Sequence, residues 1–285
     1  MQSTVGLNRP PGIEPVQARF HAIAEDLTTN LPEELVLAIF AYLDLPALVS
    51  VSQVNKLWRQ LSGDRFLWKA VLKSICPRLQ IFDDVDLAAH IDLAAYGLSV
   101  DGASPLRLMI PHLRRCPSLP VEGEAGITLL TIPKGLTLNK LIKLARSPQQ
   151  GKSTRFGYNW DRILYEIGDI EVAKTYHIVI TNNIFEGSRG KTVAEQRDLV
   201  GHHGCEMPRT LEQAFLLAIT HIMKGKRLYT DDPWTYSCCE EQILESHVLV
   251  GGFGSTCYIG INAVLRKYNS CSRDVRGMGG VLRGS

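Results

Sequence analysis

The chain has 285 residues, enough for one large domain or two ordinary ones, and its 45% hydrophobic and 21% charged residues are typical of a soluble globular protein. The formal net charge is +2 with Lys and Arg spread along the chain, which argues against nucleic-acid binding. No apolar run approaches the ~20 residues that span a bilayer, and the N-terminus lacks the pattern of a secretory signal. The seven cysteines, an odd number, predict reduced thiols in a cytosolic protein.

The first 30 residues are predicted to form a disordered or loosely helical arm. Residues 1–15 are rich in proline, glycine and asparagine, which disfavour regular structure. Residues 16–30 carry an apolar stripe at helical spacing: Val16, Phe20, Ile23 and Leu27. A short amphipathic helix and a loosely attached arm both fit this stripe.

Residues 31–75 contain more large apolar side chains than a few short helices can bury in their own core. Two groups recur at helical spacing, namely Leu31, Leu35, Ile39 and Leu43, then Val51, Val54, Trp58 and Leu61. Pro32 suits the first turn of a helix, and Glu33 and Glu34 suit the positive end of its dipole. Asp64 after Gly63 predicts a helix cap. The surplus of apolar surface indicates that a partner protein covers part of it.

This segment resembles an F-box. The family pattern opens with Leu31-Pro32 and two acidic residues, continues with Tyr42-Leu43, and then has a signature that runs from Val51 to Arg59. It closes with the aromatic helix of residues 66–69, Phe-Leu-Trp-Lys. The resemblance implies docking onto the Skp-type adaptor of a cullin-RING ubiquitin ligase, with this chain as the substrate receptor. The alternative is a small helical bundle whose apolar residues pack only on one another.

We expect a subset of the F-box-like segment to contact the adaptor or to support that contact from within. These residues are Leu31, Pro32, Leu35, Ile39, Leu43, Val51, Trp58 and Trp68. Apolar burial between helices would provide the affinity. The sequence does not sort the contacting side chains from the supporting ones.

The fold class expected for the whole chain is α+β: a small all-helical F-box followed by a separate mixed α+β domain. Residues 76–126 are predicted to form a connector with short helical patches at 85–96 and 106–113. Residues 127–285 are predicted to form the second domain, with strands at 127–132, 175–181, 247–253, 258–264 and 280–282 and helices at 137–145, 192–200 and 210–223. Strands and helices do not alternate strictly, which favours a mixed sheet over a doubly wound one.

The second domain also resembles the domain that follows the F-box in proteins of amoeba-associated, chlamydia-like bacteria. The resemblance lies in residues 136–141, 175–192, 204–214 and 231–242. Those proteins are regarded as candidate secreted effectors that use the host ubiquitin machinery. The resemblance implies a bacterial protein that acts in a host cytosol and is secreted without a Sec signal, and it assigns no catalytic motif.

Three kinds of chemical site are suggested by short residue patterns, and each has a simpler interpretation. Residues 151–154 and 190–192 imitate phosphate-binding loops but lack the required first glycine. His202, His203 and Cys205 lie close together, and His202 and Cys205 have a usable ligand spacing for zinc, but the later pair Cys238 and Cys239 is adjacent and rarely binds one ion. A nucleophile, Cys205 or Cys238 with His177, His203 or His247, has no flanking signature. Trp234 in an acidic loop is either a partner anchor or a lid over the core.

The prediction is therefore a non-catalytic substrate receptor with two partners, a Skp-type adaptor and an unknown protein substrate. No catalytic residue, cofactor or metal is expected. The alternative is an effector enzyme with Cys/His chemistry in residues 127–285 that uses the F-box as a docking handle. A third hypothesis is a decoy that binds the adaptor and recruits nothing.

Overall fold

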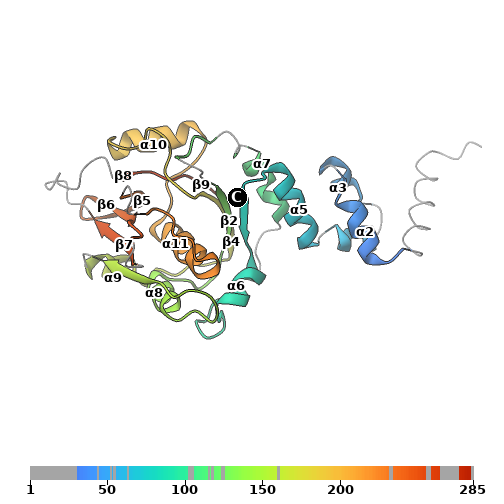
Figure 1. Cartoon of the computed structure of the whole chain (residues 1–285), viewed down its shortest axis with the longest axis horizontal. Coiled ribbons are helices and arrows are strands. Elements are labelled where there is room, and N and C mark those ends of the chain that lie inside the picture. The colour runs from blue at the N-terminus through green and yellow to red at the C-terminus, as the bar shows by residue number, and fades with distance from the viewer. Residues whose placement is uncertain are drawn as a thin grey trace, which may run out of the picture. The chain divides into compact units, whose positions relative to one another are not determined.

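A computed structural model describes residues 31–43, 45–51, 53, 56–62, 64–101, 106–114, 116, 119–122, 126–158, 161–230, 234–254, 258–263 and 276–283 (Figure 1). The chain divides into two compact units, Met1–Val71 and Leu72–Ser285. The arm predicted for residues 1–30 lies outside the described residues.

The first unit is helical in its described part. It contains α2 (Glu33–Phe40), α3 (Leu45–Val51), α4 (Lys56–Leu61) and the first turns of α5 (Arg65–Ile75). Pro32 immediately precedes α2, whose first turn holds Glu33 and Glu34 near the positive end of the helix dipole. The Asp64 carboxylate accepts the backbone N–H groups of Phe66 and Leu67 at 2.8 and 3.0 Å, and so caps α5 as the sequence predicts.

The second unit contains two sheets. The first has the strand order β1 (Leu79–Phe82), β2 (Ile127–Ile132), β4 (Tyr176–Thr181) and β9 (Val281–Arg283). Strand β1 runs parallel to β2, and the other pairs are antiparallel. The second sheet has the order β3 (Arg155–Tyr158), β7 (Tyr258–Ala263), β6 (Ser246–Gly251), β5 (Tyr236–Ile243) and β8 (Arg276–Gly277).

Helix α11 (Thr210–Lys224) is the centre of the second unit. Figure 1 shows it between the two sheets, and it contacts β2 of one sheet and β5, β6 and β7 of the other. Nearly every side chain from Thr210 to Ile222 is buried. The remaining helices are α6 (Asp84–His90), η1 (Leu106–Met109), α7 (Ile110–Leu113), α8 (Leu138–Arg146), α9 (Asp161–Ile167) and α10 (Val193–His202).

The α+β class is confirmed, with an F-box-like helical segment ahead of a separate domain. Several local predictions hold closely: β2 has the predicted bounds, Thr137 caps α8, and Gly225 ends α11 in the left-handed conformation that favours glycine. The helical patch predicted at 85–96 is shorter, because α6 ends at His90.

Strand β1 was not predicted, and neither were β3, α9, β5 and β8. Strand β1 lies in the expected connector, residues 76–126, and pairs with β2 from Leu79–Ile127 to Phe82–Leu130. Strand β1 therefore lies in the same compact unit as β2. No helix among the described residues is long and apolar enough to cross a membrane.

Candidate functional site

Helix α2 and the turn after it leave a row of large apolar side chains in solvent. Leu35 is 51% exposed, Ile39 50% and Tyr42 92%. Their spacing of four and then three residues places them on one face. We call Leu35, Ile39 and Tyr42 the apolar stripe. Such a face on so short a helix is a candidate contact surface for a partner protein.

The opposite face of α2 holds the buried side chains Val36 and Phe40. The Phe40 ring meets the Trp58 ring edge to face, with centroids 5.3 Å apart. The other buried apolar side chains of the first unit are Leu48, Leu61, Leu67, Trp68 and Val71. The two faces of α2 therefore have different roles: one packs inward, and the stripe is left uncovered.

The predicted adaptor-binding residues fall into three classes of exposure. Pro32 joins Leu35 and Ile39 at the surface, whereas Leu31, Leu43, Val51 and Trp58 are partly buried. Trp68 is only 5% exposed, and its indole N–H donates to the Ser62 carbonyl oxygen at 2.7 Å. The Trp68 side chain is therefore not at the surface.

Two exposed aromatic side chains were not among the predicted contact residues. Tyr42 extends the stripe, and Phe66, near the start of α5, is 65% exposed. Tyr42 lies seven residues after Leu35, so helical spacing was the signal that would have included it. For Phe66, the sequence gives no means to separate it from its buried neighbour Leu67.

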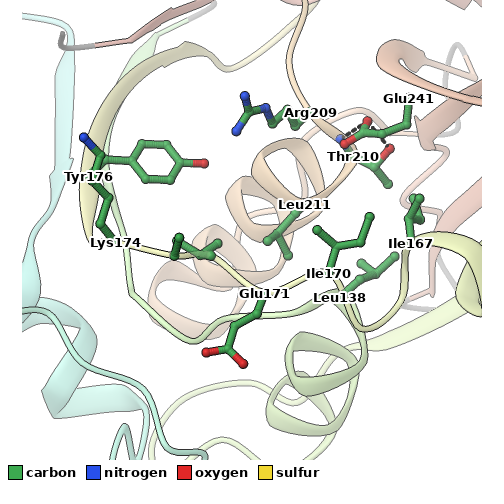
Figure 2. Close-up of a pocket in the computed structure, with 12 residues that line it drawn as sticks. Leu138, Ile167, Ile170, Glu171, Lys174, Tyr176, Arg209, Thr210, Leu211 and Glu241 are labelled. Atoms are coloured by element: carbon green, nitrogen blue, oxygen red, sulfur yellow. Dashed lines mark hydrogen bonds between the residues drawn. The ribbon is translucent and has the colours of Figure 1, made fainter.

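The second unit has a pocket of about 340 Å³ at the N-terminal end of α11 (Figure 2). Apolar side chains line much of it, with polar and charged groups around them. The lining residues are Leu138, Ile167, Ile170, Glu171, Val172, Ala173, Lys174, Tyr176, Arg209, Thr210, Leu211 and Glu241. The volume lies at the lower end of the range that holds small ligands.

Beside this pocket lies a buried ion pair that fixes the start of α11. The Glu212 side chain is fully buried, and its carboxylate accepts from Arg283 at 2.8 and 3.0 Å and from the Tyr176 hydroxyl at 3.0 Å. Burial and the adjacent Glu212 carboxylate raise the pKa of Tyr176, so its phenol stays a hydrogen-bond donor. Burial alone would lower the pKa of Arg283, but the Glu212 carboxylate reverses this and raises it.

The first unit can be compared with known families on this geometry. Residues 28–74 match the family model described as F-box-like. The chain therefore carries an F-box-like domain. Domains of this family typically bind Skp-type adaptors and serve substrate recognition rather than catalysis. No curated protein and no solved structure matches the chain.

The cysteines considered as nucleophiles, Cys205 and Cys238, are buried. Both, and the neighbouring Cys239, are at most 5% exposed and form no disulfide. Burial raises the pKa of the Cys239 thiol, which disfavours the reactive thiolate. The Nδ1 atom of His247 lies 2.9 Å from the Cys239 carbonyl oxygen, so this ring nitrogen hydrogen-bonds to the backbone. Among the described residues no three His, Cys, Asp or Glu side chains form a group that could hold a metal.

The two segments that imitate phosphate-binding loops, and the loop that carries Trp234, form ordinary structural contacts. Thr192 caps α10 in a capping box with Glu195, which confirms residues 190–192 as a turn before a capped helix. The backbone N–H of Lys152 donates to the Ile222 carbonyl oxygen at 3.0 Å. Trp234 is 48% exposed and stacks on Tyr236 with ring centroids 6.2 Å apart. Trp234 is thus half covered, which fits neither a lid that is buried over the core nor a fully exposed anchor for a partner.

Proposed function

We propose that this protein is a substrate receptor of a cullin-RING ubiquitin ligase. Its F-box-like domain docks onto a Skp-type adaptor, and its second unit recruits a protein for ubiquitination. The observation that carries the proposal is the coincidence of two independent features in one short segment. The segment matches the F-box-like model over residues 28–74, and it exposes the apolar stripe on α2.

The apolar stripe gives the docking step a physical basis. Covering Leu35, Ile39 and Tyr42 with a partner helix removes apolar surface from water at roughly 25 cal/mol per Å², before the costs of association. Tyr42 is the best candidate for a dominant contact, because tyrosine is enriched among residues that contribute most to binding. Leu31, Leu43, Val51, Trp58 and Trp68 support the stripe from inside the domain or at its margin, while Pro32 lies at the start of α2.

A pull-down with purified adaptor tests this step. Tyr42→Ala combined with Ile39→Ala should weaken capture by on the order of 2 kcal/mol or more, about thirtyfold, because both side chains leave the stripe. The matched control is Tyr165→Ala, since Tyr165 on α9 is 90% exposed and lies outside the F-box-like domain. Equal capture of the stripe variant and the control would contradict the docking model. Circular dichroism on each variant excludes loss of folding as the cause.

The proposed place of action is the cytosol of a eukaryotic host, into which a chlamydia-like bacterium delivers the protein without a Sec signal. This part rests on the resemblance of residues 127–285 to the domain found after the F-box in such proteins. Proximity labelling in host cells, with the intact chain and with a form that lacks residues 31–71, tests it. Host adaptor and cullin should be labelled by the intact chain only. Equal labelling by both forms would contradict the proposal.

Adaptor-dependent ubiquitination separates a receptor from a decoy. A receptor should cause at least one co-captured protein to gain ubiquitin in a reconstituted reaction, and this gain should disappear with the Tyr42→Ala, Ile39→Ala variant. Adaptor binding with no ubiquitinated partner would favour the decoy. The buried thiols of Cys205, Cys238 and Cys239 give the enzyme alternative no support.

A further inference from the structure

The pocket at the start of α11 has a wall that is held in place by backbone hydrogen bonds. The loop between α9 and β4 contributes residues 170–174 to this wall. The Val172 N–H donates to the Leu136 carbonyl oxygen at 3.0 Å, and the Gly135 N–H donates to the Val172 carbonyl oxygen at 2.9 Å. The pocket is therefore formed before any ligand arrives, which reduces the entropic cost of binding.

The floor of the pocket is suited to one large aliphatic or aromatic side chain. Leu138 is buried, and Leu211 and Ile167 are partly buried beside it. Ile170 is 62% exposed at the rim. Figure 2 shows Leu211 in the middle of the site, with Ile170, Ile167 and Leu138 on one side and Tyr176 and Lys174 on the other. A volume of about 340 Å³ holds one such side chain and a short piece of main chain.

Some charged groups around the floor already form hydrogen bonds or ion pairs, and others do not. The Glu241 carboxylate accepts both the backbone N–H and the hydroxyl of Thr210 at 2.7 Å. Arg209 is exposed and makes a long contact of 3.4 Å to Glu240. Among the described residues Lys174 forms no hydrogen bond or ion pair, and it is exposed. Lys174 is thus open to an incoming group, whereas Arg209 is already in contact with Glu240.

The negative charge of Glu171 does not neutralise the positive charge of Lys174 inside the pocket. Figure 2 shows its carboxylate directed away from Leu211, on the outer side of the loop. The first backbone N–H groups of α11 are also occupied, because Glu241 binds that of Thr210 and Glu212 binds that of Arg209. The available polar recognition therefore comes from the Lys174 ammonium group, which favours a carboxylate.

We propose that this pocket binds a short peptide segment of the recruited protein in which a large apolar side chain stands next to a carboxylate. The apolar side chain enters between Leu138, Ile167 and Leu211, and the carboxylate pairs with Lys174, whose side chain Figure 2 shows beside Tyr176. The rim residues Ile170, Ala173 and Lys174 are exposed, so the rest of the peptide leaves along the surface. This inference deepens the proposed receptor function and rests on it.

Fluorescence polarisation with the full chain and labelled hexapeptides tests the proposal. The first probe, Gly-Ser-Gly-Ser-Leu-Glu with an amidated end, carries an acidic side chain. The second, Gly-Ser-Gly-Ser-Gly-Leu, carries a free C-terminal carboxylate, and the third is its amide. At least one of the first two probes should bind about tenfold more tightly than the third, because the third lacks the charged acceptor. The comparison of the first two shows which carboxylate is preferred.

Variants of the pocket provide the second arm. Lys174→Glu should weaken the better acidic probe about tenfold or more through charge reversal, and Ile170→Asp should weaken every probe that carries leucine. Lys143→Glu is the matched control, since Lys143 is an exposed lysine of α8 outside the pocket. Equal affinity for the acidic probes and the amide, or equal loss in Lys143→Glu and Lys174→Glu, would overturn the proposal. Octanoate that displaces the probes at equal concentration would assign the pocket to a small amphipathic acid instead.

The adaptor pull-down keeps this proposal separate from the receptor function. Lys174→Glu and Ile170→Asp should capture the adaptor like the unchanged chain, and Tyr42→Ala with Ile39→Ala should bind the peptide probes normally. If peptide binding fails while adaptor capture persists, the pocket proposal is wrong and adaptor docking stands. If adaptor capture fails while peptide binding persists, adaptor docking is wrong and the pocket proposal stands.

Discussion

The two units of this protein treat large apolar side chains in opposite ways. On α2, Leu35, Ile39 and Tyr42 are left in solvent, whereas α11 is covered by β2, β5, β6 and β7. A helix enclosed on all sides serves the stability of its own fold, and a helix with a bare apolar face is available to another chain. The difference indicates that substitutions in the apolar stripe act mainly on association, and those in α11 mainly on folding.

The strongest way to break this comparison is to remove a core side chain from α11. Phe215→Ala should lower the free energy of unfolding of the second unit by about 3–5 kcal/mol, because it leaves a cavity at a side chain that is 1% exposed. Leu35→Ala, at a residue 51% exposed, should change the unfolding free energy by no more than about 0.5 kcal/mol. Urea denaturation of both variants measures the contrast. Similar losses would show that the stripe also stabilises the fold.

A smaller but still large effect is expected at the buried ion pair. Arg283→Met leaves the Glu212 carboxylate buried, with the Tyr176 hydroxyl and the Arg209 backbone N–H as its remaining partners among the described residues. We expect a loss of about 3 kcal/mol, because an uncompensated buried charge is costly. The double variant Arg283→Met, Glu212→Met should recover part of this loss in the same denaturation assay. No recovery would mean that packing, rather than the charge, was lost.

The smallest expected effect concerns pH and His221 of α11. Its Nδ1 atom lies 2.6 Å from the Thr154 hydroxyl, and its ring meets Phe253 edge to face. Burial, and then the positive charges of Lys152 and Arg227, lower the pKa of His221 below its usual 6.5. Below pH 6.5 the His221 ring is protonated more readily in the unfolded chain than in the folded one. The contribution of His221 to the free energy of unfolding is therefore full above pH 6.5 and declines as the pH falls below it.

Thermal melting between pH 7.5 and pH 5 checks this sign. The unchanged chain should lose melting temperature on acidification, and His221→Gln should lose less over the same range. If both proteins have parallel pH profiles, His221 does not contribute the dependence. Adaptor capture, which relies on the other unit, should not follow the His221 substitution.

The sequence predicted the helices and strands whose apolar spacing, caps or β-branched residues lie within a short stretch of chain. The apolar face and glycine end of α11, the threonine cap of α8 and the β-branched run of β2 are all legible in short windows. Strands β1, β3 and β5 were missed because distant pairing defines them. The four residues of β1 become a strand by pairing with β2, and β5 carries two glutamates in its second half.

The sequence was less informative about the candidate site than about the fold. Leu35 and Val36 are adjacent aliphatic residues, yet one is exposed and the other packs inward. Helical spacing permits either assignment until the neighbouring helices are placed. The pocket was not predicted, because Lys174 lies in a segment separate from Arg209 and Leu211 and the three residues share no motif.

The short stretch from Arg276 to Arg283 joins the two sheets of the second unit. Strand β8 pairs with β5 in one sheet, and β9 pairs with β4 in the other, with Leu282 opposite Val179. Strands β8 and β9 are synthesised after their pairing partners β5 and β4. All residues of the F-box-like domain are synthesised earlier, so this domain does not depend on the last strands. We therefore expect the adaptor-binding end to fold first during synthesis, which pulse proteolysis of ribosome-bound chains stalled before residue 276 would reveal. The F-box-like domain would then be folded while the two sheets of the second unit are still incomplete.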